Sequence, residues 1–544
     1  MKSFIKWVLG LLVLLLLLIF GAYHLGLRKF LIDRVQEKLL NAINQDPSRL
    51  YDITCSTADV NLSSGNIVVY EVYVTPRQHI VDSIYQQQEV VRMLLELKVE
   101  KISLSHLNIR QLLLNEHIDL DNIEIHSPEL EIMLNPATEL VEDKSLIQEI
   151  FIPEFSISLD NFDIINASAI IDNVAFQDSF FMALDSFNLH VDNIYIDSSS
   201  FDGPIEENFG NLIVEARNLR SPAIDIYQME AEKMSFDLSE NRFKIEEINL
   251  KPSMDKQAYG RKNNEESDWL EGTVKAVELH NFDLSLWHAS GKIHYEKISI
   301  TQPELYVFRD KRLPDPNPSA TYLPPHMLRN IPLTFRVDTV EIKQGNVTYE
   351  EHHEGYDIPS RMVINDVYGS GYRLTNDSIY WSSNGHYEMD LKARLWNDGH
   401  MHSHMRMPLY GESDNIEIVG KVSDLQFEKM NEFFEHTLYL RFESGSLHSL
   451  NFSLDVGDKA ATGSVDINYS DLKIEVLGLP NAADKSGKKK NRLYSFLANT
   501  VVPKNYHPQS RHYKQGYVSV LRPRDKSIFK YMAVCMQDGI VSCM

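Results

Sequence analysis

The chain of 544 residues contains only three cysteines, Cys55, Cys535 and Cys543. They are too few for a disulfide framework, and their spacing does not match a metal site. The motifs of common enzymes are also missing: there is no Gly-x-Ser-x-Gly elbow, Walker loop, Gly-x-Gly-x-x-Gly fingerprint or His-Glu-x-x-His. Carboxylates abound, but nothing singles out a pair for acid–base chemistry. The sequence therefore predicts a protein that is not an enzyme and uses no cofactor.

Positive charge is scarce in most of the chain, which has a net charge of −24. Residues 1–38 carry +4 and residues 483–544 carry +9, so the middle of the chain carries −37. Such an acidic body repels nucleic acid, because phosphate contacts need clustered lysine and arginine. The basic ends suit an anionic membrane surface, where each basic residue contributes about 1 kcal/mol, and the alternative for the tail is charge that is simply solvated.

Long hydrophobic runs are missing except at the start, where 17 apolar or weakly polar residues extend from Trp7 to Tyr23. The run is long enough to span a bilayer, and no convincing small-x-small cleavage site follows it. We therefore expect residues 1–24 to form an uncleaved transmembrane anchor in which Trp7 contacts the membrane. The basic residues between Arg28 and Lys38 would, by charge alone, keep the rest of the chain in the cytoplasm.

Most of the remaining chain alternates apolar and polar residues, as half-buried β-strands do. Gly-Asn and Gly-Asp pairs at Gly65, Gly345 and Gly457 predict hairpin turns. Helical spacing is found in few places: 32–43, 85–97, 425–434 and the tail. The sequence predicts a mainly β fold, an elongated and curled antiparallel sheet.

One stretch of 35 residues occurs twice, 175 positions apart. Residues 99–133 align with 274–308 without a gap and share eight identities. Pro128 and Pro303 cannot donate to a sheet, so each marks an edge, a turn or a bulge, and we interpret each copy as a strand, a turn and a strand. We interpret the stretch as a duplicated β unit with one apolar face. The residues expected on that face are Ile123, Ile125, Leu130 and Ile132 in the first copy, and Ile298, Ile300, Leu305 and Val307 in the second. Glu124 and Ser299 are expected to face outward.

These patterns divide the chain into regions: an anchor at 1–24, a first β segment at 25–270, a second at 271–480 and a basic tail at 481–544. The candidate linkers are polar or rich in proline: 252–269, 309–326 and 478–492. We expect the proline-rich linker to be extended and the other two to be mobile.

A local cluster of possible metal ligands is HMHSHM, in which His400, His402 and His404 would share one face of a strand. Three adjacent imidazoles could hold Zn²⁺ or Cu²⁺. Met401 and Met405 alternate with them, however, as in a half-buried strand that turns polar histidines to water. The histidines are therefore weak metal candidates.

The tail sequence DKSIFKYMAVCMQDGIVSCM predicts a helix that starts near Asp525 or Ser527 and stops at Gly539. The apolar side of this helix carries Ile528, Phe529, Met532 and Met536. Because basic residues precede it, we expect these side chains to contact a membrane interface. The alternative is a helix that plugs or caps one end of the sheet.

The anchor, the strand unit VEKISLSHLNIRQLLLNEHIDLDNIEIHSPELEI and the late segment SGSLHSLNFSLDVGDKAATGSVDINYSDLKIEVLG together resemble the AsmA-like family of envelope proteins. Relatives in that family include TamB and YhdP. The chain looks most similar to the shorter members from Bacteroidota-type Gram-negative bacteria. The resemblance covers about residues 28–478 and consists of strand patterns, with no catalytic signature.

The resemblance implies an inner-membrane anchor with the body in the periplasm. It also implies a repeating β-groove that binds or conducts the acyl chains of phospholipid or another lipid, in outer-membrane biogenesis or homeostasis. Partners would include the outer-membrane surface or assembly proteins. The alternative is a non-catalytic scaffold or assembly factor for outer-membrane proteins, with a self-closed β-sandwich core.

Overall fold

A computed structural model describes these residues: 51–61, 63–78, 82, 93–108, 110–111, 117–134, 156–173, 180–197, 200, 205–221, 226–315, 321–380, 385–409, 414–477, 502–510 and 513–543. The expected anchor at 1–24, with Trp7, and the expected helix at 32–43 lie outside them. Among the helices of the described part, none has the length and apolar character needed to cross a membrane.

The protein is mainly β, as predicted, and most of its strand pairs are antiparallel. Two compact units divide the chain. The first comprises Met1–Ile224 and Met229–Phe243, and the second comprises Asp225–Gln228 and Lys244–Met544. The expected boundary at 270/271 falls inside a strand of the second unit, and the basic tail belongs to that unit.

Strands of the first unit pair in the order β3, β4, β5 with β6, β7, β8, β9 and β10, while β1 and β2 both pair with β3. Their bounds are β1 (Tyr51–Thr54), β2 (Thr57–Asn61), β3 (Asn66–Pro76), β4 (Met93–Ser105), β5 (His117–His126), β6 (Glu129–Leu134), β7 (Ser156–Asn173), β8 (Phe180–Ile196), η1 (Ile205–Asn208), β9 (Leu212–Arg220) and β10 (Tyr227–Asp237). The core of this unit is a cluster of hydrophobic side chains, mostly aliphatic, from β1 and from β3 to β9.

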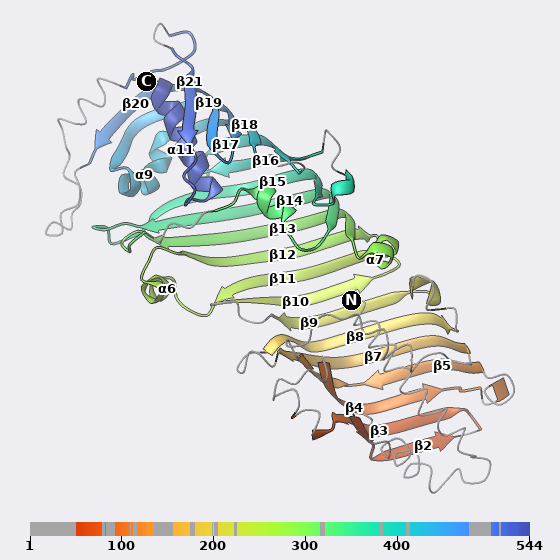
Figure 1. Ribbon diagram of the computed structural model, residues 1–544. Helices are drawn as coiled ribbons and strands as arrows, with labels where there is room; N and C mark the ends of the chain where they lie inside the picture. Colours follow the sequence, from red (N-terminus) through yellow and green to blue (C-terminus); the bar gives the residue numbers. More distant parts are fainter. Residues whose placement is uncertain are drawn as a thin grey trace. The chain divides into compact units, whose positions relative to one another are not determined.

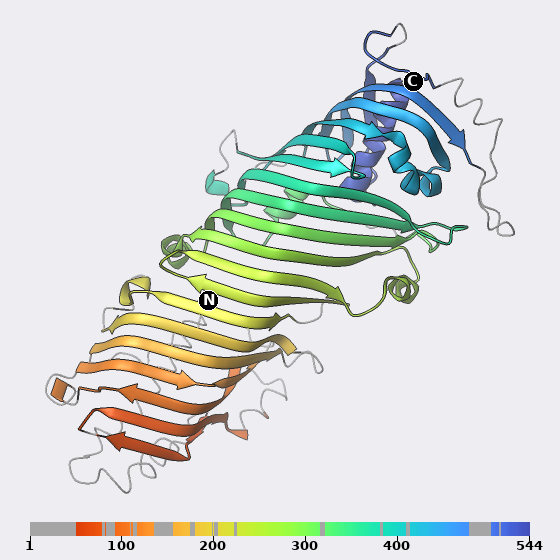
Figure 2. The same cartoon turned by 180° about the vertical axis from the view of Figure 1, so that it is seen from behind.

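Strands of the second unit pair in chain order from β12 to β21, with helices at the strand ends and against one face (Figures 1 and 2). The bounds are β11 (Arg242–Pro252), α6 (Lys256–Asn263), β12 (Asp268–Phe282), α7 (Leu284–Ser290), β13 (Ile293–Asp310), α8 (Pro324–Arg329), β14 (Phe335–His352), β15 (Ser360–Thr375), η2 (Ser378–Tyr380), β16 (His386–Leu395), β17 (Gly399–Pro408), β18 (Ile416–Gln426), η3 (Phe427–Met430), α9 (Asn431–Thr437), β19 (Leu440–Val456), β20 (Ala460–Val476), β21 (Gly516–Leu521) and α11 (Ile528–Cys543).

The duplicated unit is confirmed and is longer than predicted. In both copies an antiparallel pair is followed by a parallel pair and then by another antiparallel pair. In the first copy, β4 pairs with β5 and β6, these two strands pair with β7, and β7 pairs with β8. In the second copy, β12, β13, β14 and β15 pair in that order. Equivalent residues pair alike. Leu104 opposite Ile123 corresponds to Leu279 opposite Ile298.

The chain continues through the prolines of the repeat without reversing its direction, so the predicted turns are wrong. β5 and β6 follow one another along the same neighbours, and β13 passes through Pro303 without a break. The preceding residues, Ser127 and Gln302, both have a left-handed φ of 48°. The left-handed residue shifts the alternation by one, while the register with both neighbouring strands stays the same before and after it. Ile125 and Leu130, which are five positions apart, therefore reach the same face.

Other local predictions had mixed outcomes. Hairpins form at Gly65, between β2 and β3, and at Gly457, between β19 and β20, whereas Gly345 is a bulge inside β14. The helix expected at 425–434 is present as η3 and α9, but residues 93–97 of the helix expected at 85–97 belong to β4.

Two expected linkers contain helices. α6 lies in the stretch 252–269, where the Asp255 side chain caps it by accepting from the backbone N–H groups of Gln257 and Ala258. α8 lies in the proline-rich stretch and starts at Pro324, since proline suits the first helical turn.

Candidate functional site: the apolar face of the second unit

Strand pairing in the second unit gathers apolar side chains into rows, because cross-strand partners point to the same side of a sheet. We call this side the apolar face and the opposite side the polar face. The rows over β12, β13, β14 and β15 are Leu279, Ile298, Val340 and Gly371; Val277, Ile300, Ile342 and Gly369; Gly272, Leu305, Val347 and Ile364; and Leu270, Val307, Tyr349 and Met362.

The four residues expected in the second copy all lie in these rows. Ile298, Ile300 and Val307 are half-buried, and Leu305 is 39% exposed. This part of the apolar face is therefore accessible. Ser299 lies on the opposite, polar face as expected, but it is buried there: it is 5% exposed, and its hydroxyl donates to Glu341 at 3.3 Å.

The equivalent residues of the first copy are more deeply enclosed. Ile123 and Ile125 are 0% exposed, Leu130 packs against their cluster, and Ile132 is half-buried. The same sequence unit thus has a filled apolar face in the first unit and an accessible one in the second.

Further along the second unit, α11 covers the apolar face at β20 and β21 (Figure 1). Tyr531 and Cys535 are buried in a cluster with residues of β16 to β21. The helix does not stop at Gly539 as predicted. A side chain there would come within 2.3 Å of Val465, so the glycine allows the helix to approach the sheet closely.

The tail residues expected at a membrane interface do not all lie in the same environment. Ile528, Met532 and Met536 pack against the sheet cluster, whereas Phe529 is 80% exposed. The arrangement favours the alternative in which the helix caps the sheet.

The connection from β13 to β14 fastens α11 in place. Its Thr321 donates its backbone N–H to the carbonyl of Arg524 at 2.8 Å and its hydroxyl to the carbonyl of Lys526 at 2.7 Å. Arg522 in turn donates to the Thr321 carbonyl and to Asp458. The contacts of Thr321 join segments about 200 positions apart, and sequence patterns did not predict them.

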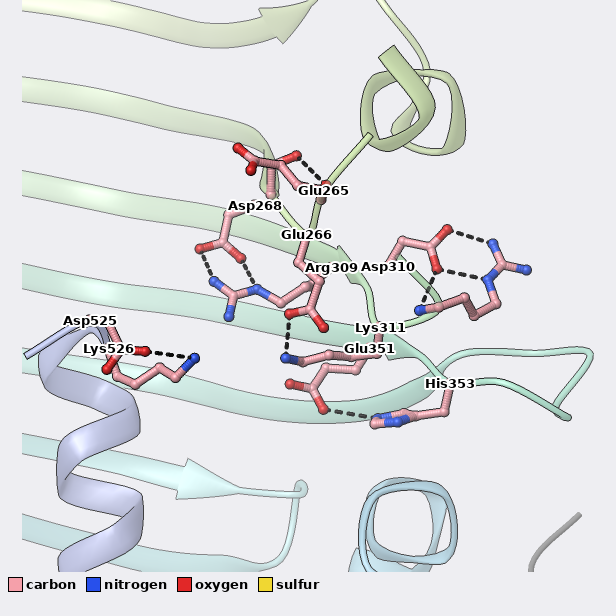
Figure 3. Close-up of polar contacts among 12 residues, drawn as sticks. Glu265, Glu266, Asp268, Arg309, Asp310, Lys311, Glu351, His353, Asp525 and Lys526 are labelled. Carbon is pink, nitrogen blue, oxygen red and sulfur yellow. Dashed lines mark hydrogen bonds and ion pairs between the residues drawn. The ribbon is translucent and has the colours of Figure 1, made fainter. Parts of the chain in front are cut away.

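A polar rim borders the apolar face at one end of its strands (Figure 3). The row after Leu270 and Val307 consists of Asp268, Arg309 and Glu351. Arg309 donates two hydrogen bonds to Asp268, at 2.7 and 2.6 Å. Lys311 pairs with Glu266, and His353 lies 3.0 Å from Glu351. This side of the sheet is therefore apolar over the rows described above and charged at this end of the strands.

Hydrogen bonds keep the rim charged. Burial raises the pKa of Glu351, but hydrogen bonds from His353 and Tyr349 outweigh it, so the pKa lies below its usual value. Burial, together with the neighbouring Glu351 carboxylate, raises the pKa of Tyr349. Glu351 therefore stays ionised and Tyr349 stays a neutral donor at physiological pH.

The histidine cluster lies where predicted, on one face of β17. His400 and His402 are exposed on the polar face, and His404 Nδ1 lies 3.0 Å from Asp390 Oδ1. No set of three or more possible metal ligands comes together anywhere in the described ranges.

No protein-family model matches the chain, and no curated protein is similar to it.

Proposed function

We propose that the protein binds the acyl chains of a lipid, with phospholipid as the first candidate, along the apolar face of β12 to β15. The observation that carries this proposal is the set of aliphatic rows that stay partly exposed beside a charged rim. Each methylene removed from water contributes about 0.8 kcal/mol, so two long acyl chains represent about 20 kcal/mol. An amphipathic ligand would have its headgroup at the rim.

We further propose that residues 1–24 anchor the protein in the inner membrane, that its body lies in the periplasm, and that it conducts lipid for outer-membrane biogenesis or homeostasis. The AsmA-like strand patterns and the 17-residue apolar run support this setting. Outer-membrane surface or assembly proteins are then the expected partners, and no catalytic residue is required.

One observation favours the scaffold alternative for part of the chain. Ile123 and Ile125 are fully buried, so the first unit has a packed core where they lie. Lipid contact is therefore proposed for the second unit.

Site-specific photo-cross-linking tests the proposal in the full-length protein in cells. A benzophenone amino acid at Leu305, on the apolar face, should give lipid adducts detected by mass spectrometry. The same probe at Glu304, which is exposed on the opposite face of the same strand, is the matched control. Lipid adducts at neither position, or equal amounts at both, would overturn the proposal.

A further inference from the structure

Two adjacent hollows lie on the polar face of β15 to β20, further along the sheet than the proposed lipid site. One has a volume of about 380 Å³ and the other about 360 Å³, and His402 and Lys421 line both. Asn451 and Ser453 line the first, and Lys392 lines the second. They form one continuous polar depression across neighbouring strands.

The depression is lined by the cations Lys392, Arg394 and Lys421 and by the carboxylates Asp366 and Asp466, so its charge is slightly positive in a strongly acidic chain. Lys392 on β16 is directly opposite His402 on β17, which is directly opposite Lys421 on β18. Arg394 and His400 are opposite each other one row away. One strand therefore separates the two lysines, and the His402 imidazole lies between them.

The nearby carboxylates are already engaged. Asp366 pairs with Arg394 at 3.7 Å, and Asp390 with His404 at 3.0 Å. Asp466 accepts from the Tyr513 hydroxyl and from Gln515 at 3.3 Å. Among the described residues, Lys392 and Lys421 have no carboxylate within ion-pair distance.

We propose that this depression binds a phosphate-bearing anion. Lys392 and Lys421 lie two strand spacings apart, about 10 Å, with the His402 imidazole between them. Two ammonium groups and a ring N–H can surround the oxygens of a phosphate or diphosphate, and Asn451 and Ser453 add neutral donors. Charge-assisted hydrogen bonds to phosphate are about twice as strong as neutral ones. The proposal does not depend on lipid binding at the apolar face.

Calorimetric titration of the full-length protein, in a phosphate-free detergent, with inorganic pyrophosphate tests the site. Replacing both lysines (K392Q with K421Q) should weaken binding at least about tenfold, since each substitution removes a charge-assisted hydrogen bond to the anion. The matched control is K297Q with K343Q, the same change of charge on the polar face at lysines that pair with Glu341. The control should bind pyrophosphate as the unchanged protein does.

Flotation with phosphatidylcholine vesicles, with and without phosphatidic acid, identifies the source of the phosphate. Binding to phosphatidate vesicles that pyrophosphate reverses indicates a lipid headgroup, whereas binding of pyrophosphate alone indicates a soluble phosphate compound. The proposal fails if the unchanged protein binds neither probe, or if both lysine pairs weaken binding equally. Cross-linking of lipid at residue 305 reports separately on the proposed function.

Discussion

At the residue scale, a single left-handed residue in each copy decides which side chains reach the apolar face. Ser127 and Gln302 shift the alternation by one position, so Leu130 joins Ile125 and Leu305 joins Ile300. The sequence pattern placed these residues on one side correctly but attributed the shift to a turn. A left-handed residue within a strand and a turn between two strands produce the same change of phase in a sequence, and strand neighbours distant in the chain distinguish them.

Replacing Ile125 by aspartate tests the enclosed copy. Ile125 is 0% exposed, so I125D buries an unpaired charge and should reduce the free energy of unfolding by about 3 kcal/mol or more. I300D, at the half-buried equivalent, should cost less, about 1–2 kcal/mol. Chemical denaturation of the full-length protein measures both, with E124D as the control on the opposite face. Equal losses in I125D and E124D would show that the assigned register is wrong.

At the element scale, the predictable parts are those with a local signal. Period-two alternation identified the strands and the duplicated unit, because side-chain direction in a strand depends only on neighbouring residues. The parallel pairing of β13 with β14 joins residues 42 positions apart, such as Ile298 and Val340, and α11 is held by contacts such as that of Thr321 with Arg524. No local pattern encodes these contacts. The candidate apolar rows were therefore predictable, whereas their coverage by α11 was not.

The attachment of α11 can be tested through its thiols. Cys535 is fully buried, and burial raises its thiol pKa to about 11, so it should react slowly with alkylating reagents near neutral pH. Arg522, whose side chain is 3% exposed, precedes the helix in the chain and donates hydrogen bonds to Asp458 and to the carbonyl of Thr321. In a C55S background, R522A should raise the alkylation rate of Cys535 about tenfold.

Mass spectrometry of labelled peptides measures that rate. R524A is the matched control, because this arginine is largely exposed and its contact with Asp458 is long, at 3.4 Å. If R522A and R524A label at the same rate, Arg522 does not hold the helix on the sheet.

At the scale of the whole molecule, each compact unit has hydrophobic clusters of its own. The cluster around Ile123 belongs to the first unit, and the clusters around Leu454, Leu447 and Trp269 belong to the second. Separate cores allow each unit to unfold cooperatively by itself. The division also separates the two copies of the repeat, one enclosed and one accessible, into different units.

Thermal unfolding of the full-length protein in detergent should therefore show two transitions, and one substitution should move each of them. I125D should lower the transition of the first unit and leave the other unchanged. L454A removes a side chain that is 2% exposed in the second unit, at a cost of about 2–5 kcal/mol, and should lower only the second transition. Differential scanning calorimetry measures both midpoints.

The double variant should show the two shifts added together, because distant sites without shared partners are additive. A single transition that both substitutions lower would mean that the units unfold as one, and the cores would then have to be regarded as coupled.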